Sequence, residues 1–145
     1  MSNASFTWPV WAALSAVFAA LTAIFGKLGV EKINSDFATL IRTVIILAVL
    51  AAIVASTGAW QPLGTVRSRT WLFLGLSALA TGASWLCYYR ALQLGPAAGV
   101  APIDKVSVLL VALFAVTFLG ERLSPSGWLG VAMVGAGGVL VALKG

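Results

Sequence analysis

Five apolar segments, each long enough to cross a bilayer, recur along this chain of 145 residues. A helix needs about 20 residues to cross roughly 30 Å of hydrocarbon, and short polar connections separate runs of about that length. Hydrophobic residues make up 61% of the chain and charged residues only 9%, which leaves too few polar side chains to cover a water-soluble surface. We therefore predict an all-α integral membrane protein with five transmembrane helices in a single domain, residues 1–145.

The ends of the helices follow from residues that start and stop helices. Asn34, Ser35 and Asp36 are typical N-caps, because their short polar side chains accept hydrogen bonds from free backbone N–H groups. Gly95 stops the third helix, and Pro96 suits the first turn of the fourth, where a backbone N–H would lack a partner anyway. The predicted helices cover residues 8–28, 37–55, 71–91, 97–119 and 126–143.

The charged residues exclude several classes of function. The nine basic residues are scattered along the chain and form no binding stripe, so we expect no nucleic-acid partner. The chain has no histidine and only one acid deep in a predicted helix, so we expect no enzymatic activity and no catalytic residue. We also expect no metal site and no cofactor. The four acids are Glu31, Asp36, Asp104 and Glu121.

Two charged residues lie well inside predicted helices. Arg42 is six residues into the second helix and Asp104 eight residues past Pro96, which places them roughly 9 and 12 Å along their helices. Both helices start on the same side of the membrane, where Arg90 ends the third helix and Lys105 adjoins Asp104. A charge near the bilayer centre costs about 2.5 to 3.5 kcal/mol, so placement toward lipid is unfavourable. We therefore expect these four side chains to face a cavity or the interior of the bundle.

The cluster predicts a site for substrate binding or coupling. Asp104 and Lys105 are about 100° apart around their helix, so each is expected to have another partner, and the candidate pair is Asp104 with Arg42 or Arg90. The four residues leave two surplus positive charges, which water, a lipid phosphate or an anionic substrate group could balance. Pro102 adds to the site because it removes a backbone hydrogen bond, and broken helices form binding sites in transporters. Two structural alternatives remain: Arg90 reaches the membrane interface, or Arg42 and Asp104 form a structural pair.

The fifth helix carries small residues in place of charges. Ala132 with Ala136, and Gly138 with Ala142, are small residues four apart, which allow two helix backbones to approach closely. These four residues are candidates for a dimer contact. The alternative is that they pack against another helix of the same chain.

The basic residues in the loops give little preference for one orientation. An odd number of helices puts the two ends of the chain on opposite sides of the membrane. The side that holds the N-terminal end receives Arg67, Arg69 and Arg122, and the other side receives Lys27, Lys32, Arg90 and Lys144. Orientation follows the excess of Lys and Arg in short loops, so a count of three against four predicts that the chain can insert both ways.

The stretch RALQLGPAAGVAPIDKVSVLLVALFAVTFLGERLSPSGWLGVAMVGAGGVLVAL, together with FGKLG in the first helix and IRT in the second, resembles the EamA domain of the drug/metabolite transporter superfamily. Members of that family typically carry two such units in inverted orientation, whereas this chain carries one. The resemblance therefore implies two copies that oppose one another in the membrane. Small multidrug resistance proteins of the same superfamily form their dimer contact with the last helix and use a glutamate in the first, which is absent here. Asp104 is then the buried carboxylate available for coupling.

Together, these features predict a secondary transporter, an exporter or exchanger of small metabolites with an anionic or zwitterionic group. It would work by alternating access, as an oligomer that we expect to be an antiparallel homodimer. The expected partners are membrane lipid, a small-molecule substrate and a second copy of the chain. The expected location is a bacterial or archaeal cell (inner) membrane, crossed several times. The alternative is a non-transporting membrane subunit, or a protein that binds or translocates lipid.

Overall fold

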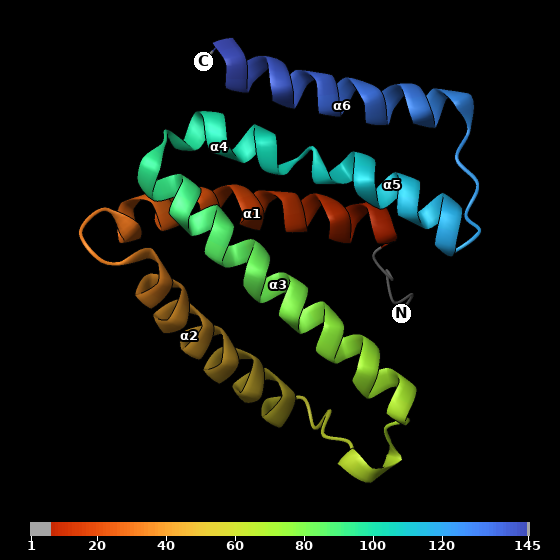
Figure 1. Ribbon diagram of the computed structural model, residues 1–145. Coiled ribbons are helices and arrows are strands. Elements are labelled where there is room, and N and C mark those ends of the chain that lie inside the picture. Colours follow the sequence, from red (N-terminus) through yellow and green to blue (C-terminus); the bar gives the residue numbers. More distant parts are fainter. Residues whose placement is uncertain (1–6, 145) are drawn as a thin grey trace, which may run out of the picture. The chain divides into compact units, whose positions relative to one another are not determined.

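The computed structural model describes residues 7–144, and helices connected by short loops make up this part of the chain (Figure 1). A short 3-10 helix, η1 (Leu63–Thr65), precedes the third long helix. The α-helices are α1 (Trp8–Val30), α2 (Ser35–Ser56), α3 (Ser68–Leu94), α4 (Ala97–Asp104), α5 (Ser107–Phe118) and α6 (Pro125–Lys144).

Five segments of these helices are long and apolar enough to cross a membrane, which confirms the predicted number. The helix α4 and the helix α5 together make the fourth span, Ala97–Phe118. The helix α2 starts two residues earlier than predicted, because Asn34 alone is the N-cap and Ser35 and Asp36 already belong to the helix. The helix α3 starts three residues earlier, so Arg69 lies in its first turn.

The fourth span is interrupted shortly after Pro102. The backbone N–H groups of Lys105 and Val106 donate to the carbonyls three residues before them, at 3.1 and 2.9 Å, in place of the α-helical bonds to the fourth residue back. Proline has no N–H to donate and its ring crowds the preceding turn, so the hydrogen bond that Pro102 removes is the one to the Ala98 carbonyl, inside α4. The interruption lies three residues further along, and the span predicted as one helix over residues 97–119 is two helices.

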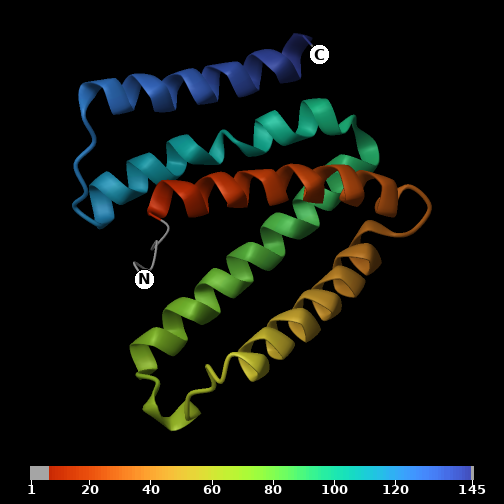
Figure 2. The same ribbon diagram turned by 180° about the vertical axis from the view of Figure 1, so that it is seen from behind.

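Contacts group the chain into two units, which we describe separately. The first unit, residues 1–28 and 94–145, contains most of α1 together with α4, α5 and α6. Within it, α6 packs alongside both α4 and α5, as two opposite views show (Figures 1 and 2). The Lys27 Nζ donates a hydrogen bond of 3.0 Å to the Gly95 carbonyl, which ties the end of α1 to the start of the fourth span.

Glycines bring α6 close to its neighbours. A Cβ atom at Gly138 would collide with the Pro102 carbonyl oxygen of α4, and a Cβ atom at Gly135 would collide with the Leu109 side chain of α5. Both glycines are buried. The backbones of α4 and α6 are therefore in direct contact at Gly138. A residue with a side chain at this position would push the two helices apart.

The second unit, Gly29–Gln93, contains α2 and α3. Polar and aromatic contacts join its parts. The Gln93 side-chain amide donates to the carbonyls of Val30 and Ile33, at 3.3 and 2.9 Å, and so fixes the loop before α2 against the end of α3. Further contacts between α2 and α3 build the candidate site described below.

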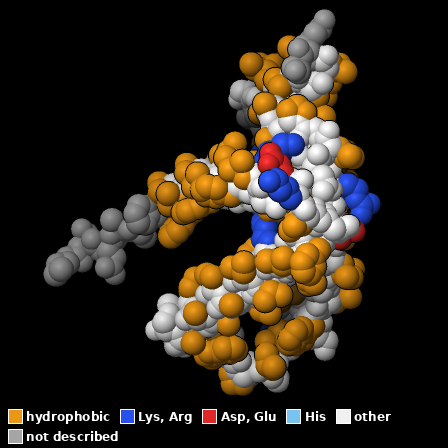
Figure 3. Space-filling model, turned by 90° about the vertical axis from the view of Figure 1, so that its left-hand side faces the viewer, with side chains coloured by type: hydrophobic (Ala, Val, Ile, Leu, Met, Phe, Trp, Pro, Cys, Tyr) orange, Lys and Arg blue, Asp and Glu red, His pale blue; other side chains and the backbone are white. Residues whose placement is uncertain are grey.

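Hydrophobic side chains dominate the surface of the helices, and charged side chains occupy only a few places (Figure 3). Leu, Ile, Val and Phe side chains along all the spans are largely exposed in the isolated chain. Such a surface is unfavourable in water and is what a helix presents to lipid. The structure thus supports the membrane assignment made from the sequence.

Candidate binding site between α2 and α3

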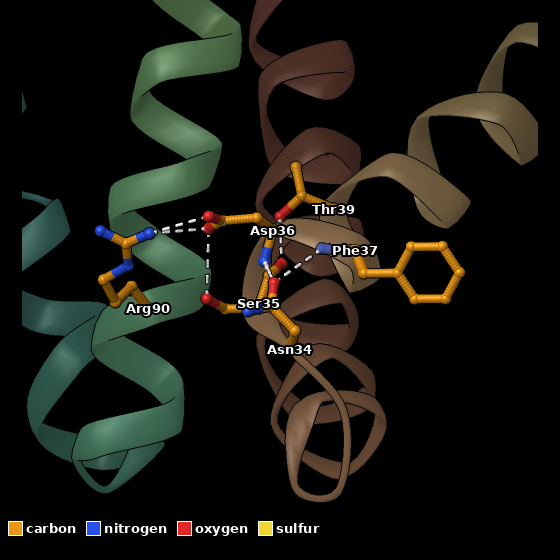
Figure 4. A network of polar contacts seen from close by, with 6 residues as sticks. All are labelled: Asn34, Ser35, Asp36, Phe37, Thr39 and Arg90. Atoms are coloured by element: carbon orange, nitrogen blue, oxygen red, sulfur yellow. Dashed lines mark hydrogen bonds and ion pairs between the residues drawn. The ribbon is translucent and has the colours of Figure 1, made fainter.

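The ends of α2 and α3 are joined by an ion pair between Asp36 and Arg90. The Arg90 Nη2 donates to both carboxylate oxygens of Asp36 at 2.9 Å, and the Ser35 hydroxyl donates to one of them at 3.3 Å (Figure 4). The Asn34 side-chain oxygen accepts from the N–H groups of Asp36 and Phe37 and so holds this first turn in place. We call these residues the polar clasp of the second unit.

The partner of Arg90 is therefore Asp36, and the predicted pairing of Arg90 with Asp104 is corrected. The sequence analysis treated Asp36 only as a capping residue. Its position contained the signal that was missed, because the start of the second helix and the end of the third lie on the same side of the membrane. An acid in the first turn of α2 is also favoured by the positive end of the helix dipole.

Asp104 and Lys105 pair with each other, contrary to the prediction that each has another partner. The Lys105 Nζ lies 3.1 Å from an Asp104 carboxylate oxygen, and both side chains are partly exposed. Lys105 keeps helical backbone angles (φ −72°, ψ −10°), so the two side chains still leave the helix in different directions, but the long lysine side chain can bend back to its neighbour.

The structure also assigns Pro102 and Gly138, two other predicted site residues, to the contact between α4 and α6. For Gly138 the alternative to a dimer contact, packing within the chain, is the observed one. Ala132 and Ala136 are exposed and Ala142 is half-buried, and their role in a dimer stays a prediction.

Arg42 is the charged residue of the predicted cluster that takes part in neither of these two ion pairs. Its guanidinium carbon lies 4.0 Å from the centre of the Trp85 ring and 5.3 Å from the centre of the Tyr89 ring, both on α3. Such cation–π contacts lower the cost of placing an arginine among apolar residues. The Nη1 atom is buried and has no hydrogen-bond partner among the residues that the structure describes. Its neighbours within the second unit are aromatic, and the pairing of Arg42 with Asp104 stays a prediction.

A cleft of about 380 Å³ lies between α2 and α3, and Arg42 adjoins it through Trp85 without lining it. Trp85 forms part of its lining and carries the Arg42 guanidinium on its ring, so the cation and the cleft share this side chain. The volume falls in the range of small-molecule sites. The lining residues are Thr39, Thr43, Leu74, Ser77, Ala78, Thr81, Gly82 and Trp85.

Four hydroxyl side chains line the cleft, and the two helices use them differently. On α2, the hydroxyls of Thr39 and Thr43 donate to the carbonyls one turn back, at 2.9 and 2.8 Å. On α3, the hydroxyls of Ser77 and Thr81 make no hydrogen bond to the part of the chain that the structure describes. Serine and threonine hydroxyls inside helices often donate to the backbone carbonyl four residues back. Because Ser77 and Thr81 do not, their hydroxyls are available to a ligand.

The sequence analysis did not find the cleft. Its polar lining follows helical spacing, because Thr39 and Thr43 are four residues apart, as are Ser77, Thr81 and Trp85. This regular spacing is the signal that could have found the cleft. Small polar residues are common in membrane helices as packing residues, so the spacing alone would not have distinguished a site from a helix contact.

The fold places this protein among the all-helical membrane proteins that cross the bilayer several times. Residues 6–143 match the model of the EamA-like transporter family, so the chain belongs to this family of transporters, which are typically not enzymes. The resemblance found in the sequence is thereby confirmed.

Two curated relatives support the assignment. A Sinorhizobium protein described as an uncharacterized transporter in the cobO 3′ region is 64% identical over 137 residues, which cover 94% of this chain and 97% of the relative. The uncharacterized transporter YwfM of Bacillus subtilis is 34% identical over 73 residues, which cover 50% of this chain and 24% of the relative. Both relatives are bacterial. No solved structure matches the chain.

Proposed function

We propose that this protein is a secondary transporter that exports or exchanges small metabolites with an anionic or zwitterionic group, by alternating access. The proposal rests on the buried Nη1 atom of Arg42, which has no hydrogen-bond partner among the described residues. A buried donor without a partner costs roughly 1 to 3 kcal/mol, and more when the group is charged. An anionic group of the substrate in the adjacent cleft would satisfy this donor with a charge-assisted hydrogen bond.

The other two basic residues of the predicted cluster, Arg90 and Lys105, are less suited to bind an anion, because each is already paired with an acid. Arg90 is neutralised by Asp36, and Lys105 is neutralised by Asp104. Arg42 therefore remains as the cation of the cluster without a carboxylate partner among the described residues. We assign it the role of binding the substrate anion.

Alternating access also needs a segment that can change shape. The break between α4 and α5 supplies a bend with weaker backbone hydrogen bonding in the middle of a span. Asp104 and Lys105 lie at this bend, and an ion pair joins their side chains to each other. We propose that Asp104 is the coupling carboxylate and that opening of this pair accompanies bending of the span.

The test is exchange of radiolabelled organic anions and amino acids by purified protein in liposomes of neutral phospholipid. Wild-type protein is expected to exchange at least one compound faster than empty liposomes, and Arg42→Gln is expected to lower that rate tenfold or more. Arg69→Gln is the matched control, because Arg69 also lies over an aromatic ring, Phe73, at 5.6 Å, and Phe73, unlike Trp85, does not line the cleft. Equal losses in both variants would reject Arg42 as the binding group.

The second candidate is a protein that binds or translocates lipid, because a lipid phosphate could satisfy Arg42 in the same way. Anionic phosphatidylglycerol would then compete with the substrate for the site. If phosphatidylglycerol stabilises the wild-type protein against heating and no soluble anion does, with both results dependent on Arg42, the lipid function replaces the proposed one.

We further propose an antiparallel homodimer, which rests on the sequence. Two five-helix units form an inverted pair only when they insert in opposite directions. Three lysines added after Lys144 should fix one orientation, and three added before Trp8 the other. Each form alone should transport poorly, and co-expression should restore transport, with cysteine labelling at Ser2 and Gly145, in a background with Cys87 replaced, reporting the orientation. Full activity of one form alone would reject the antiparallel dimer.

A further inference from the structure

The cleft next to Arg42 offers no carboxylate to a ligand. A zwitterion carries an ammonium group beside its anionic group, and inside a cleft the charge of the ammonium needs a negative charge beside it to offset its desolvation. The eight residues that line the cleft are four with hydroxyl groups, one tryptophan and three small or aliphatic residues. Of these described residues, none is acidic.

The acid nearest to the cleft along α2 is already neutralised. Asp36 precedes Thr39 and Thr43 by three and seven residues, so it lies on the same face of the helix as these two lining residues. Both of its carboxylate oxygens accept from Arg90 at 2.9 Å, and one also accepts from Ser35. A substrate ammonium would have to break this clasp to use Asp36.

The charge beside the cleft is therefore positive. The Arg42 guanidinium attracts an anionic group and repels an ammonium group held near it, and both effects are stronger in a partly buried site than in water. Neutral hydrogen-bonding groups meet a different environment, because the free hydroxyls of Ser77 and Thr81 can both donate and accept. These two residues are one helical turn apart, roughly 6 Å along α3.

We infer that the site takes a small organic monoanion, such as a hydroxy acid with a mainly apolar body, and discriminates against the zwitterionic amino acid of the same shape. This inference rests on the proposed function, which leaves open whether the recognised group is anionic or zwitterionic. The anion lies on Arg42. The neutral remainder extends along the α3 wall of the cleft, past Thr81 and Ser77.

The test compares matched pairs of compounds that differ only in a hydroxyl or an ammonium group at the second carbon. Lactate with alanine, 2-hydroxy-4-methylpentanoate with leucine, and phenyllactate with phenylalanine span three sizes. Binding to the full-length protein in nanodiscs of phosphatidylcholine is measured by titration calorimetry at pH 7. At least one hydroxy acid is expected to bind tenfold or more tightly than its amino acid, and Arg42→Gln to remove this preference.

The outcomes separate this inference from the proposed function. If the amino acid of every pair binds as tightly as the hydroxy acid, or if no hydroxy acid binds, the inference is overturned. If binding of the amino acids is lost in Arg42→Gln, the anion site itself still stands. If Arg42→Gln leaves the affinities of all bound compounds unchanged, the proposed site fails as well. The primary amides of the hydroxy acids, which have the same shape and no charge, serve as the control and are expected not to bind.

Discussion

The two units of this protein hold their helices together by opposite means. In the first unit, α6 meets α4 through glycine, and the Pro102 carbonyl lies where a side chain at Gly138 would be. In the second unit, α2 and α3 are joined by the pair of Asp36 with Arg90 and by Arg42 on Trp85. The first contact is tight and excludes any ligand. The second keeps a cation, free hydroxyls and a cleft beside it.

This difference separates positions where a change breaks packing from positions where it alters binding. Close backbone contact depends on the absence of a side chain, so it tolerates no enlargement. A contact made of long polar side chains is more adaptable, and its individual pairs contribute less to stability because they are partly exposed. Changes at the close backbone contact should therefore cost the most stability, and changes at the exposed ion pair the least.

The largest effect is expected at the tight contact. Gly138→Leu should destabilise the protein by roughly 2 to 3 kcal/mol, because the new side chain would force α6 away from α4. Gly137→Leu is the matched control, since a Cβ atom there meets nothing within 4 Å. Thermal unfolding of both variants in the same detergent measures the difference. Equal stability would show that α6 does not depend on this close approach.

The next effect distinguishes the two arginines of the second unit. Arg42→Gln should reduce transport tenfold or more, because it removes the cation beside the cleft, whereas the loss of its contact with the Trp85 ring should lower stability only modestly. Arg90→Gln should reduce transport less than about threefold, because Asp36 already neutralises Arg90. Exchange rates in liposomes, corrected for the amount of folded protein, provide the measurement. A larger loss in Arg90→Gln would assign the substrate anion to Arg90 and reverse the comparison.

A smaller effect is expected on the exposed side of α6. Ala136→Leu should lower the dimer fraction to about half or less while the monomer stays folded, because Ala136 is exposed and its enlargement would separate two copies. Gly137→Leu on the same helix serves again as the control, here for dimerisation. Cross-linking in membranes reports the dimer fraction. An unchanged yield in Ala136→Leu would place the contact on other helices.

The smallest effect concerns the polar clasp. The Asp36 and Arg90 side chains are 46% and 62% exposed, so solvent weakens their attraction. A double-mutant cycle with Asp36→Asn and Arg90→Gln should give a coupling energy of about 0.5 to 1 kcal/mol from unfolding measurements. A value near zero would mean that the pair is not formed in the membrane. A value of several kcal/mol would mean that it is shielded from water there.

The class of the protein and the number and approximate bounds of its membrane spans could be predicted from the amino-acid sequence alone. Apolar runs of about 20 residues predict spanning helices because every backbone polar group in hydrocarbon must be paired within the segment. Asn34, Gly95 and Pro96 marked helix ends for local reasons that need no tertiary contact, and the structure starts α2 and α4 at the residues that follow such signals. The motifs from Arg90 onward indicated the family for the same reason: they are local.

The tertiary structure decided which charge is paired with which. Arg90 pairs with Asp36 across 54 residues, and Lys105 pairs with its neighbour Asp104 because its long side chain bends back. Neither pairing follows from the depth of each charge along its helix, which was all that could be estimated by counting residues in the sequence. Which face of α6 packs inside the chain, and which hydroxyls of α3 stay free, likewise depend on the neighbours that each helix meets. Ion pairing, burial and the cleft each depend on two helix surfaces in contact. The sequence pattern of one helix does not show which surface of another helix it meets.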